Sequence, residues 1–143
     1  MNFKKIEEKW QNIWEKENRF AVKNHEDGKK NAYILIEFPY PSGKGLHTGH
    51  VRSYSALDAV ARKKRMQGYN VLFPMGCDSF GLEAERTAIK EHKLPQEIVE
   101  RNIAVFKEQL KMVGLSIDWS RAISTCDPDY YKWTQWQFLQ FYK

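Results

Sequence analysis

His47 and His50, three positions apart, are the residues of this chain best suited to chemistry. The residues that follow have helical spacing, which puts both histidines at the start of a helix. Backbone N–H groups there have no intrahelical partner, and the helix dipole favours anions. Gly43, Gly45 and Gly49 let the backbone approach a ligand closely. The segment is typical of a site that binds the phosphates of a nucleotide triphosphate.

Two other uses of the histidine pair have to be weighed. Zinc needs four ligands in a tetrahedral set, and no nearby Cys or carboxylate completes one. The sequence therefore predicts no protein-bound metal. A pair of purely structural histidines at a helix start remains an alternative, which the adjoining glycines weaken.

The elements that position the pair form a strand–helix–strand pattern. Residues 32–38 are almost continuously apolar, as in a strand buried on both faces of a parallel sheet. A helix is predicted from Thr48 to near Gly68, and residues 69–74 predict a second strand. This order indicates a parallel crossover that opens a doubly wound α/β sheet, in which ligands lie beyond the carboxyl ends of the strands.

Four further helices are expected outside this unit. They are an amphipathic helix over residues 3–20, a helix over 82–92, a helix over 96–113 ended by Gly114, and a helix opened by Asp127 and Pro128. A short extended stretch separates the last two. The last helix is dense in aromatic residues, so we expect it to be covered by further protein.

Asp78 follows the second predicted strand and is the best candidate for recognising a positive charge. Its carboxylate could accept hydrogen bonds from an ammonium group at the ligand edge of the sheet. Because Asp is a common N-cap, capping of the next helix is the structural alternative.

Several blocks of the sequence resemble class I aminoacyl-tRNA synthetases. His47-Thr48-Gly49-His50 resembles the His-Ile-Gly-His signature of that family, and residues 38–52 are similar to its leucine–tRNA ligases. Residues 70–82, 106–111, 117–121 and 127–137 extend the likeness over most of the chain. The resemblance implies a Rossmann-like catalytic domain that activates leucine with ATP to leucyl-adenylate and passes leucine to its tRNA. ATP would be a substrate, with Mg²⁺ carried on it.

The same resemblance implies the roles of individual residues. His47 and His50 would be catalytic and contact the ATP phosphates. The implied ATP-binding set also contains Ser42, Gly43, Gly45 and Gly49, and the implied leucine-binding set is Phe38, Tyr40, Asp78 and Phe80.

Two positions beside Asp78 depart from the family pattern. Cys77 stands where these enzymes usually carry Trp, and Glu83 stands where Pro is usual. A thiol in place of a large ring changes the pocket volume, so the amino-acid specificity is less secure than the reaction class. A synthetase for isoleucine or valine, or a non-catalytic nucleotide- or RNA-binding module, therefore stays open.

Length suggests one part of a larger enzyme. The 143 residues divide into an N-terminal helix and loop, 1–30, and the first half of the catalytic domain, 31–143. Partners would be leucine, ATP, tRNA and the remainder of the synthetase. Without those remaining contacts, we expect the chain alone to bind nucleotide weakly and to have little activity.

Composition is consistent with a folded protein outside membranes. Lys plus Arg number 23 and Asp plus Glu number 18, which gives a net charge of +5. This charge is compatible with an RNA partner and equally with ordinary surface charge. The two cysteines lack the spacing of a disulfide framework or zinc site. No apolar run reaches the ~20 residues of a membrane helix, so we expect a cytoplasmic protein.

Overall fold

The computed structural model describes residues 1–41 and 45–143. Its helices are α1 (Phe3–Lys16), α2 (Thr48–Met66), α3 (Leu82–Glu91), α4 (Pro95–Val113) and α5 (Pro128–Tyr142). Its strands are β1 (Asn31–Tyr33), β2 (Asn70–Leu72), β3 (Pro74–Cys77) and β4 (Asp118–Ser124). The mixed helix and parallel-strand architecture expected from the sequence is confirmed.

The strands pair in parallel around one central segment. β2 pairs with β1, and β3, which follows after one residue, pairs with β4. Leu72 O accepts from Ile34 N, whereas Phe73 O accepts from Asp118 N. Because successive carbonyls of a strand point to opposite edges, β1 and β4 flank the central segment on its two sides.

The first predicted strand, 32–38, is assigned as a strand only as far as Tyr33. The chain continues beside β3, and Pro39 O accepts from Asp78 N at 3.1 Å. Between these points the partner segment contains Pro74, which has no N–H to donate toward this edge. The ladder is therefore interrupted there, and the predicted second strand is likewise divided into β2 and β3.

The expected burial of residues 32–38 on both faces is wrong for the chain described. Ile36 is buried, but Leu35 is 59% exposed and Tyr33 61% exposed. Alternate side chains pack toward the core, and no described element covers the other face at this point.

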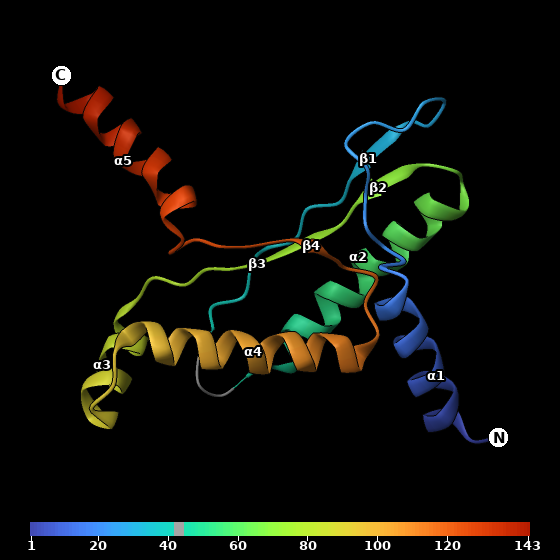
Figure 1. Cartoon of the computed structure of the whole chain (residues 1–143), viewed down its shortest axis with the longest axis horizontal. Helices are drawn as coiled ribbons and strands as arrows, with labels where there is room; N and C mark the ends of the chain where they lie inside the picture. The colour runs from blue at the N-terminus through green and yellow to red at the C-terminus, as the bar shows by residue number, and fades with distance from the viewer. Residues whose placement is uncertain (42–44) are drawn as a thin grey trace.

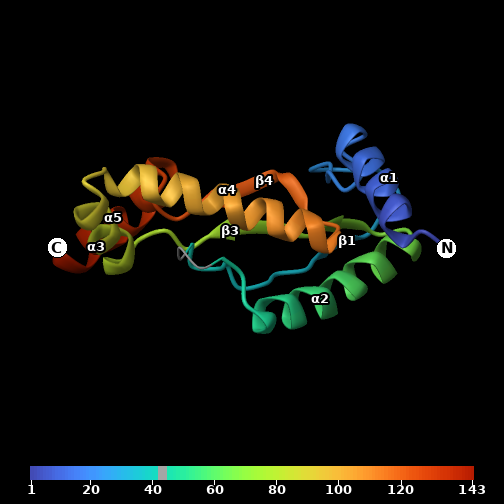
Figure 2. The same cartoon turned by 90° about the horizontal axis from the view of Figure 1, so that it is seen from below.

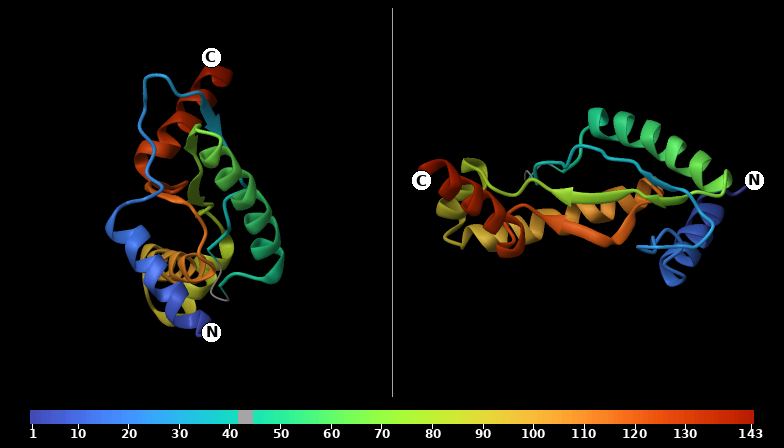
Figure 3. Two further views of the ribbon diagram at one scale, coloured as in Figure 1. Left: turned by 90° about the vertical axis from the view of Figure 1, so that its right-hand side faces the viewer. Right: turned by 90° about the horizontal axis from the view of Figure 1, so that it is seen from above.

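Helices lie on both sides of the strands (Figures 2 and 3). α2 covers one face, and α4 runs along the other. The core between them contains Ile36, Tyr54, Ala61, Val71, Phe73, Met75, Leu110, Leu115 and Ile117. Layers of helix, sheet and helix are the architecture that the strand–helix–strand pattern predicted.

The helix ends follow their sequence signals. α4 ends at Gly114, which adopts a left-handed φ of +77°, and α5 begins with Pro128 after Asp127. The first helix, α1, is shorter than the sequence predicted: it ends at Lys16 rather than near residue 20.

The basic run at the end of α2 has a structural role that sequence reasoning missed. Arg62 Nε donates to the buried Asp58 carboxylate at 2.7 Å, and Arg65 donates to Ser116 Oγ and O at 2.5 and 3.0 Å. Asp58 Oδ1 in turn accepts from Ser116 N at 2.6 Å. These contacts join α2 to the segment after α4.

α5 projects from one end of the molecule, while α1 lies at the other (Figure 1). No residue of α5 is buried. Its exposed large apolar side chains include Trp133, Trp136, Phe138, Leu139, Phe141 and Tyr142. In the described part of the chain, no helix combines the length and apolarity needed to cross a membrane.

Candidate active site

His47 and His50 cap α2 reciprocally. His47 is the N-cap, and its Nδ1 accepts from His50 N at 3.3 Å, while His50 Nδ1 accepts from His47 N at 3.2 Å. The rings stack with centroids 3.7 Å apart. The arrangement is a capping box in which both partners are histidines.

This cap fixes the protons of both rings. A ring nitrogen that accepts a hydrogen bond carries a lone pair, so the proton of a neutral imidazole must sit on Nε2. Burial lowers the pKa of His50, and the charge of His47 lowers it further. The cap therefore leaves Nε2 of each ring as the donor position, and the lowered pKa of His50 favours its neutral form.

The helix end adds to the attraction for an anion. α2 has 19 residues and no acidic residue in its first turn, so no side chain there offsets its dipole. His47 is exposed and His50 is half-buried, which leaves the pair accessible to a ligand.

Gly49 is required by a close contact, and Gly45 by its backbone conformation. A Cβ on Gly49 would lie 2.9 Å from Cε1 and Nδ1 of His47, so the stacked ring needs glycine at this position. Gly45 adopts a φ of +76°, and a Cβ there would lie 2.7 Å from the Gln109 amide. Ser42 and Gly43, the other predicted phosphate contacts, lie outside the described residues.

The predicted leucine-binding residues lie at the carboxyl end of β3. Asp78 is exposed and accepts a hydrogen bond from Thr125, the residue after β4. The N-cap of α3 is Gly81, which has no side-chain cap, so the alternative of Asp78 as a helix cap is wrong. Thr125 itself was missed because nothing in the sequence links it to Asp78.

Phe38, Tyr40 and Phe80 have different surroundings. Phe38 packs on Gly76, where a Cβ would lie 2.6 Å from its ring. The Tyr40 hydroxyl is buried and has no hydrogen-bond partner within the described residues. Phe80 is 60% exposed, and its ring centroid is 5.9 Å from that of Tyr131.

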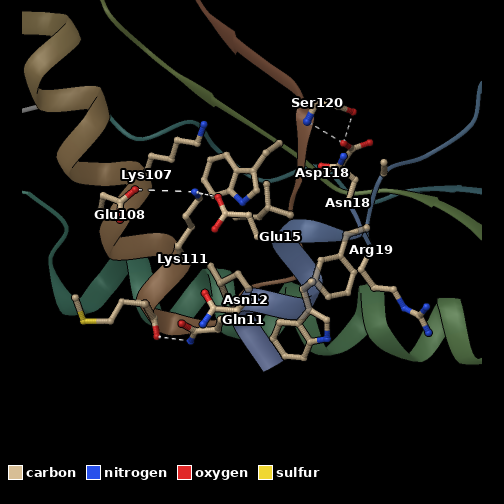
Figure 4. A pocket seen from close by; sticks show the side chains of 18 residues that line it. Gln11, Asn12, Glu15, Asn18, Arg19, Lys107, Glu108, Lys111, Asp118 and Ser120 are labelled. Atoms are coloured by element: carbon tan, nitrogen blue, oxygen red, sulfur yellow. Dashed lines mark hydrogen bonds and ion pairs between the residues drawn. The ribbon is translucent and has the colours of Figure 1, made fainter. Parts of the chain in front are cut away.

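The structure also contains a hollow of about 720 Å³ between α1 and α4 (Figure 4). Some of its charged side chains have partners: Lys111 pairs with Glu15, and Asp118 accepts from Val22 N and Ser120 N. His47 and His50 do not line it. The hollow, which Trp14, Phe20 and Trp119 also line, is therefore separate from the histidine pair.

No group of three or more His, Cys, Asp or Glu side chains suited to a metal ion occurs within residues 1–41 and 45–143. Cys77 is buried, and that burial raises its pKa to about 11. A thiol with such a pKa stays protonated at neutral pH, so it is unsuited to act as a nucleophile.

Comparison with known proteins decides the family. The family of tRNA synthetases class I (I, L, M and V) matches residues 9–143. The chain belongs to the class I tRNA synthetases. It is 58% identical over 142 residues to the leucine–tRNA ligase of Alkaliphilus oremlandii, which covers 99% of this chain and 18% of that protein.

Solved class I structures agree with the fold. The ternary complex of Agrobacterium radiobacter K84 agnB2 LeuRS with tRNA and LeuAMS has a TM-score of 0.82 at 40% identity, covering 95% of this chain and 17% of that one. Methionyl-tRNA synthetase from Mycobacterium tuberculosis, in complex with methionyl-adenylate, has a TM-score of 0.65 at 33% identity, covering 72% of this chain and 20% of that one. The chain thus spans about a fifth of the length of these class I relatives.

Proposed function

We propose that this chain is the ATP- and leucine-binding part of a leucine–tRNA ligase. A carboxylate oxygen of leucine attacks the α-phosphorus of ATP, and the bond from that phosphorus to the bridging oxygen breaks. Leucyl-adenylate forms, pyrophosphate leaves, and tRNA later accepts the leucine. The observation that carries this proposal is the reciprocal histidine cap of α2 in a chain 58% identical to a leucine–tRNA ligase.

In this proposal, His47 and His50 donate their Nε2–H groups to the phosphates as negative charge shifts toward the leaving group. Donors that are fixed before the reaction stabilise such charge without reorganising. Gly45 and Gly49 leave room for the nucleotide, and Ser42 and Gly43 are proposed as further phosphate contacts. Mg²⁺ arrives with ATP and neutralises further phosphate charge.

Leucine would bind beyond the carboxyl end of β3. The exposed carboxylate of Asp78 accepts hydrogen bonds from the leucine ammonium group, and Phe38, Tyr40 and Phe80 border its side chain. The Tyr40 hydroxyl, which has no hydrogen-bond partner within residues 1–41 and 45–143, supports a polar ligand group nearby, since a buried donor without a partner is costly.

The histidine assignment is tested by His50→Ala in the complete ligase that carries these residues. Leucine-dependent pyrophosphate exchange should show kcat lowered about 100-fold, because a transition-state donor is removed. His25→Ala is the matched control, since His25 lies in the loop before β1. An unchanged kcat for His50→Ala would refute the assignment.

Amino-acid choice is tested separately, because Cys77 and Glu83 depart from the usual pattern. Pyrophosphate exchange with leucine, isoleucine, valine and methionine should favour leucine. A preference for isoleucine or valine would show that leucine is not the substrate. A non-hydrolysable leucyl-adenylate analogue should also bind more tightly than AMP. Equal binding would instead support a nucleotide-binding module without activation.

The 143-residue chain should be a weak enzyme by itself, since it spans 18% of a similar ligase. We expect weak nucleotide binding and exchange far below that of the complete ligase. Full exchange activity from the chain alone would contradict this part of the proposal.

A further inference from the structure

One face of α4 contacts both sides of the loop that precedes the histidine cap. Asn102 Nδ2 donates to Pro41 O at 2.8 Å, and Gln109 Oε1 accepts from Leu46 N at 2.8 Å. Between them, the Phe106 ring meets the edge of the His50 ring at a centroid distance of 6.5 Å. Positions 102, 106 and 109 are spaced by four and three residues, which puts them on one face of the helix.

These contacts are in or near the core. Asn102 is 7% exposed and Phe106 is 1% exposed. A buried amide that loses its partner costs free energy, so the Asn102 contact fixes where Pro41 lies against α4.

Gln109 has a second constraint. Its amide fills the space where a Cβ of Gly45 would lie, at 2.7 Å from both Nε2 and Oε1. The left-handed Gly45 therefore lets the chain pass over Gln109, and the Leu46 N–H then points to the Gln109 oxygen. The next residue is His47, so this hydrogen bond sets the direction in which the chain enters the cap.

We propose that Asn102 and Gln109 are positioning residues for the histidine pair. The inference rests on the proposed function and assigns these side chains no contact with reacting atoms. They hold the backbone on both sides of the loop, and Phe106 supports the His50 ring, so that the two Nε2–H donors keep a fixed orientation. Asp78 is positioned by β3 and Thr125 instead, so its carboxylate does not depend on the Gln109 contact.

The decisive experiment compares Gln109→Leu with Gln109→Glu in the complete ligase. Leu removes the acceptor for Leu46 N–H, whereas Glu keeps a carboxylate oxygen at nearly the same place. We expect Gln109→Leu to lower kcat for pyrophosphate exchange about tenfold and to raise the KM for ATP, with the KM for leucine within about twofold. Gln109→Glu should retain activity within about threefold of the parent.

Controls separate positioning from general damage. Glu108→Ala changes an exposed neighbour on the same turn and should leave both KM values unchanged. If Gln109→Leu does not fold, Gln109→Met removes the acceptor with an unbranched side chain and is read in the same way. Asn102→Asp removes the donor to Pro41 O and should reproduce the kcat loss.

Two outcomes overturn the proposal. Equal loss in Gln109→Leu and Gln109→Glu would show that the acceptor is irrelevant. A KM for leucine that rises in step with the KM for ATP would show a general structural effect. Failure of the proposed function is a different result, namely an unchanged kcat in His50→Ala.

Discussion

Thr125 joins Asp78 across the β3–β4 pair. Its hydroxyl donates to Asp78 Oδ1 at 3.3 Å and accepts from Ser79 N at 2.8 Å. The backbone of Ser79 thereby fixes the hydroxyl, and the hydroxyl orients the exposed carboxylate. If Asp78 binds the leucine ammonium group, Thr125 controls the orientation of the carboxylate that binds it.

Thr125→Val should therefore weaken leucine binding. Losing one hydrogen bond of this kind costs about 1 kcal/mol, so we expect the KM for leucine to rise about fivefold. The KM for ATP should stay constant, because the histidine cap lies on another element. Thr125→Ser keeps the hydroxyl and serves as control. A KM for leucine unaffected by Thr125→Val in the exchange assay would separate Thr125 from recognition.

The pKa of His50 gives a second prediction. Burial, followed by the charge of His47, lowers this pKa, so the folded chain holds the proton less tightly than the unfolded chain. The cap's contribution to stability is then complete above the ordinary pKa of about 6.5, and it is lost as the pH falls through the lower folded value. An NMR titration should show a His50 midpoint below that of a histidine in an unstructured peptide.

His47→Ala provides the matched test of the second cause. Removing the neighbouring charge should raise the His50 pKa, while burial continues to keep it low. A His50 midpoint at or above the peptide value in the parent chain would contradict the neutral, Nε2–H donor state.

Local signals in the sequence predicted most of the elements. α2 and α4 begin and end close to the expected residues, and α5 begins where expected, because Gly68, Gly114 and the Asp127–Pro128 pair act within one turn of the chain. The interruption of the strand at Pro74 could also have been predicted from the sequence, since proline has no N–H to donate to a neighbouring strand. The burial of residues 32–38 depended on what covers the sheet, which hydrophobicity alone does not specify.

The proposed site rests on sequence motifs, whereas the residues that surround these motifs were missed. The histidines and Asp78 belong to recognisable motifs, whereas Thr125, Asn102 and Gln109 act through contacts between residues more than 40 positions apart. Arg62 and Arg65 likewise hydrogen-bond inward, to Gly114 O and Ser116 Oγ. Such partners are set by tertiary packing, for which one sequence contains no pairwise signal.

The buried Asp58 cluster should dominate the stability of α2. Asp58→Ala would leave Ser116 N–H and the Arg62 guanidinium without their carboxylate, so we expect unfolding to become easier by about 3 kcal/mol. Urea unfolding of the chain measures this change. Lys63→Ala, in the next turn and exposed, should change stability by less than about 0.5 kcal/mol. Similar effects of the two substitutions would contradict a structural role for the cluster.

The contact between Gly76 and Phe38 offers a test of packing at the sheet edge. A Cβ on Gly76 would lie 2.6 Å from Phe38 Cε2, so Gly76→Ala should destabilise the chain by about 2 kcal/mol through overpacking. Phe38→Leu removes the opposing ring edge, and in that background the same Gly76→Ala change should cost less. Gly28→Ala is the control: Gly28 has a φ of +78° but open space around it, so its cost should not depend on residue 38. Urea unfolding of the parent, of Gly76→Ala, Phe38→Leu and Gly28→Ala, and of each glycine change combined with Phe38→Leu gives the coupling free energy between residues 76 and 38. A coupling near zero would show that the ring does not restrict this position.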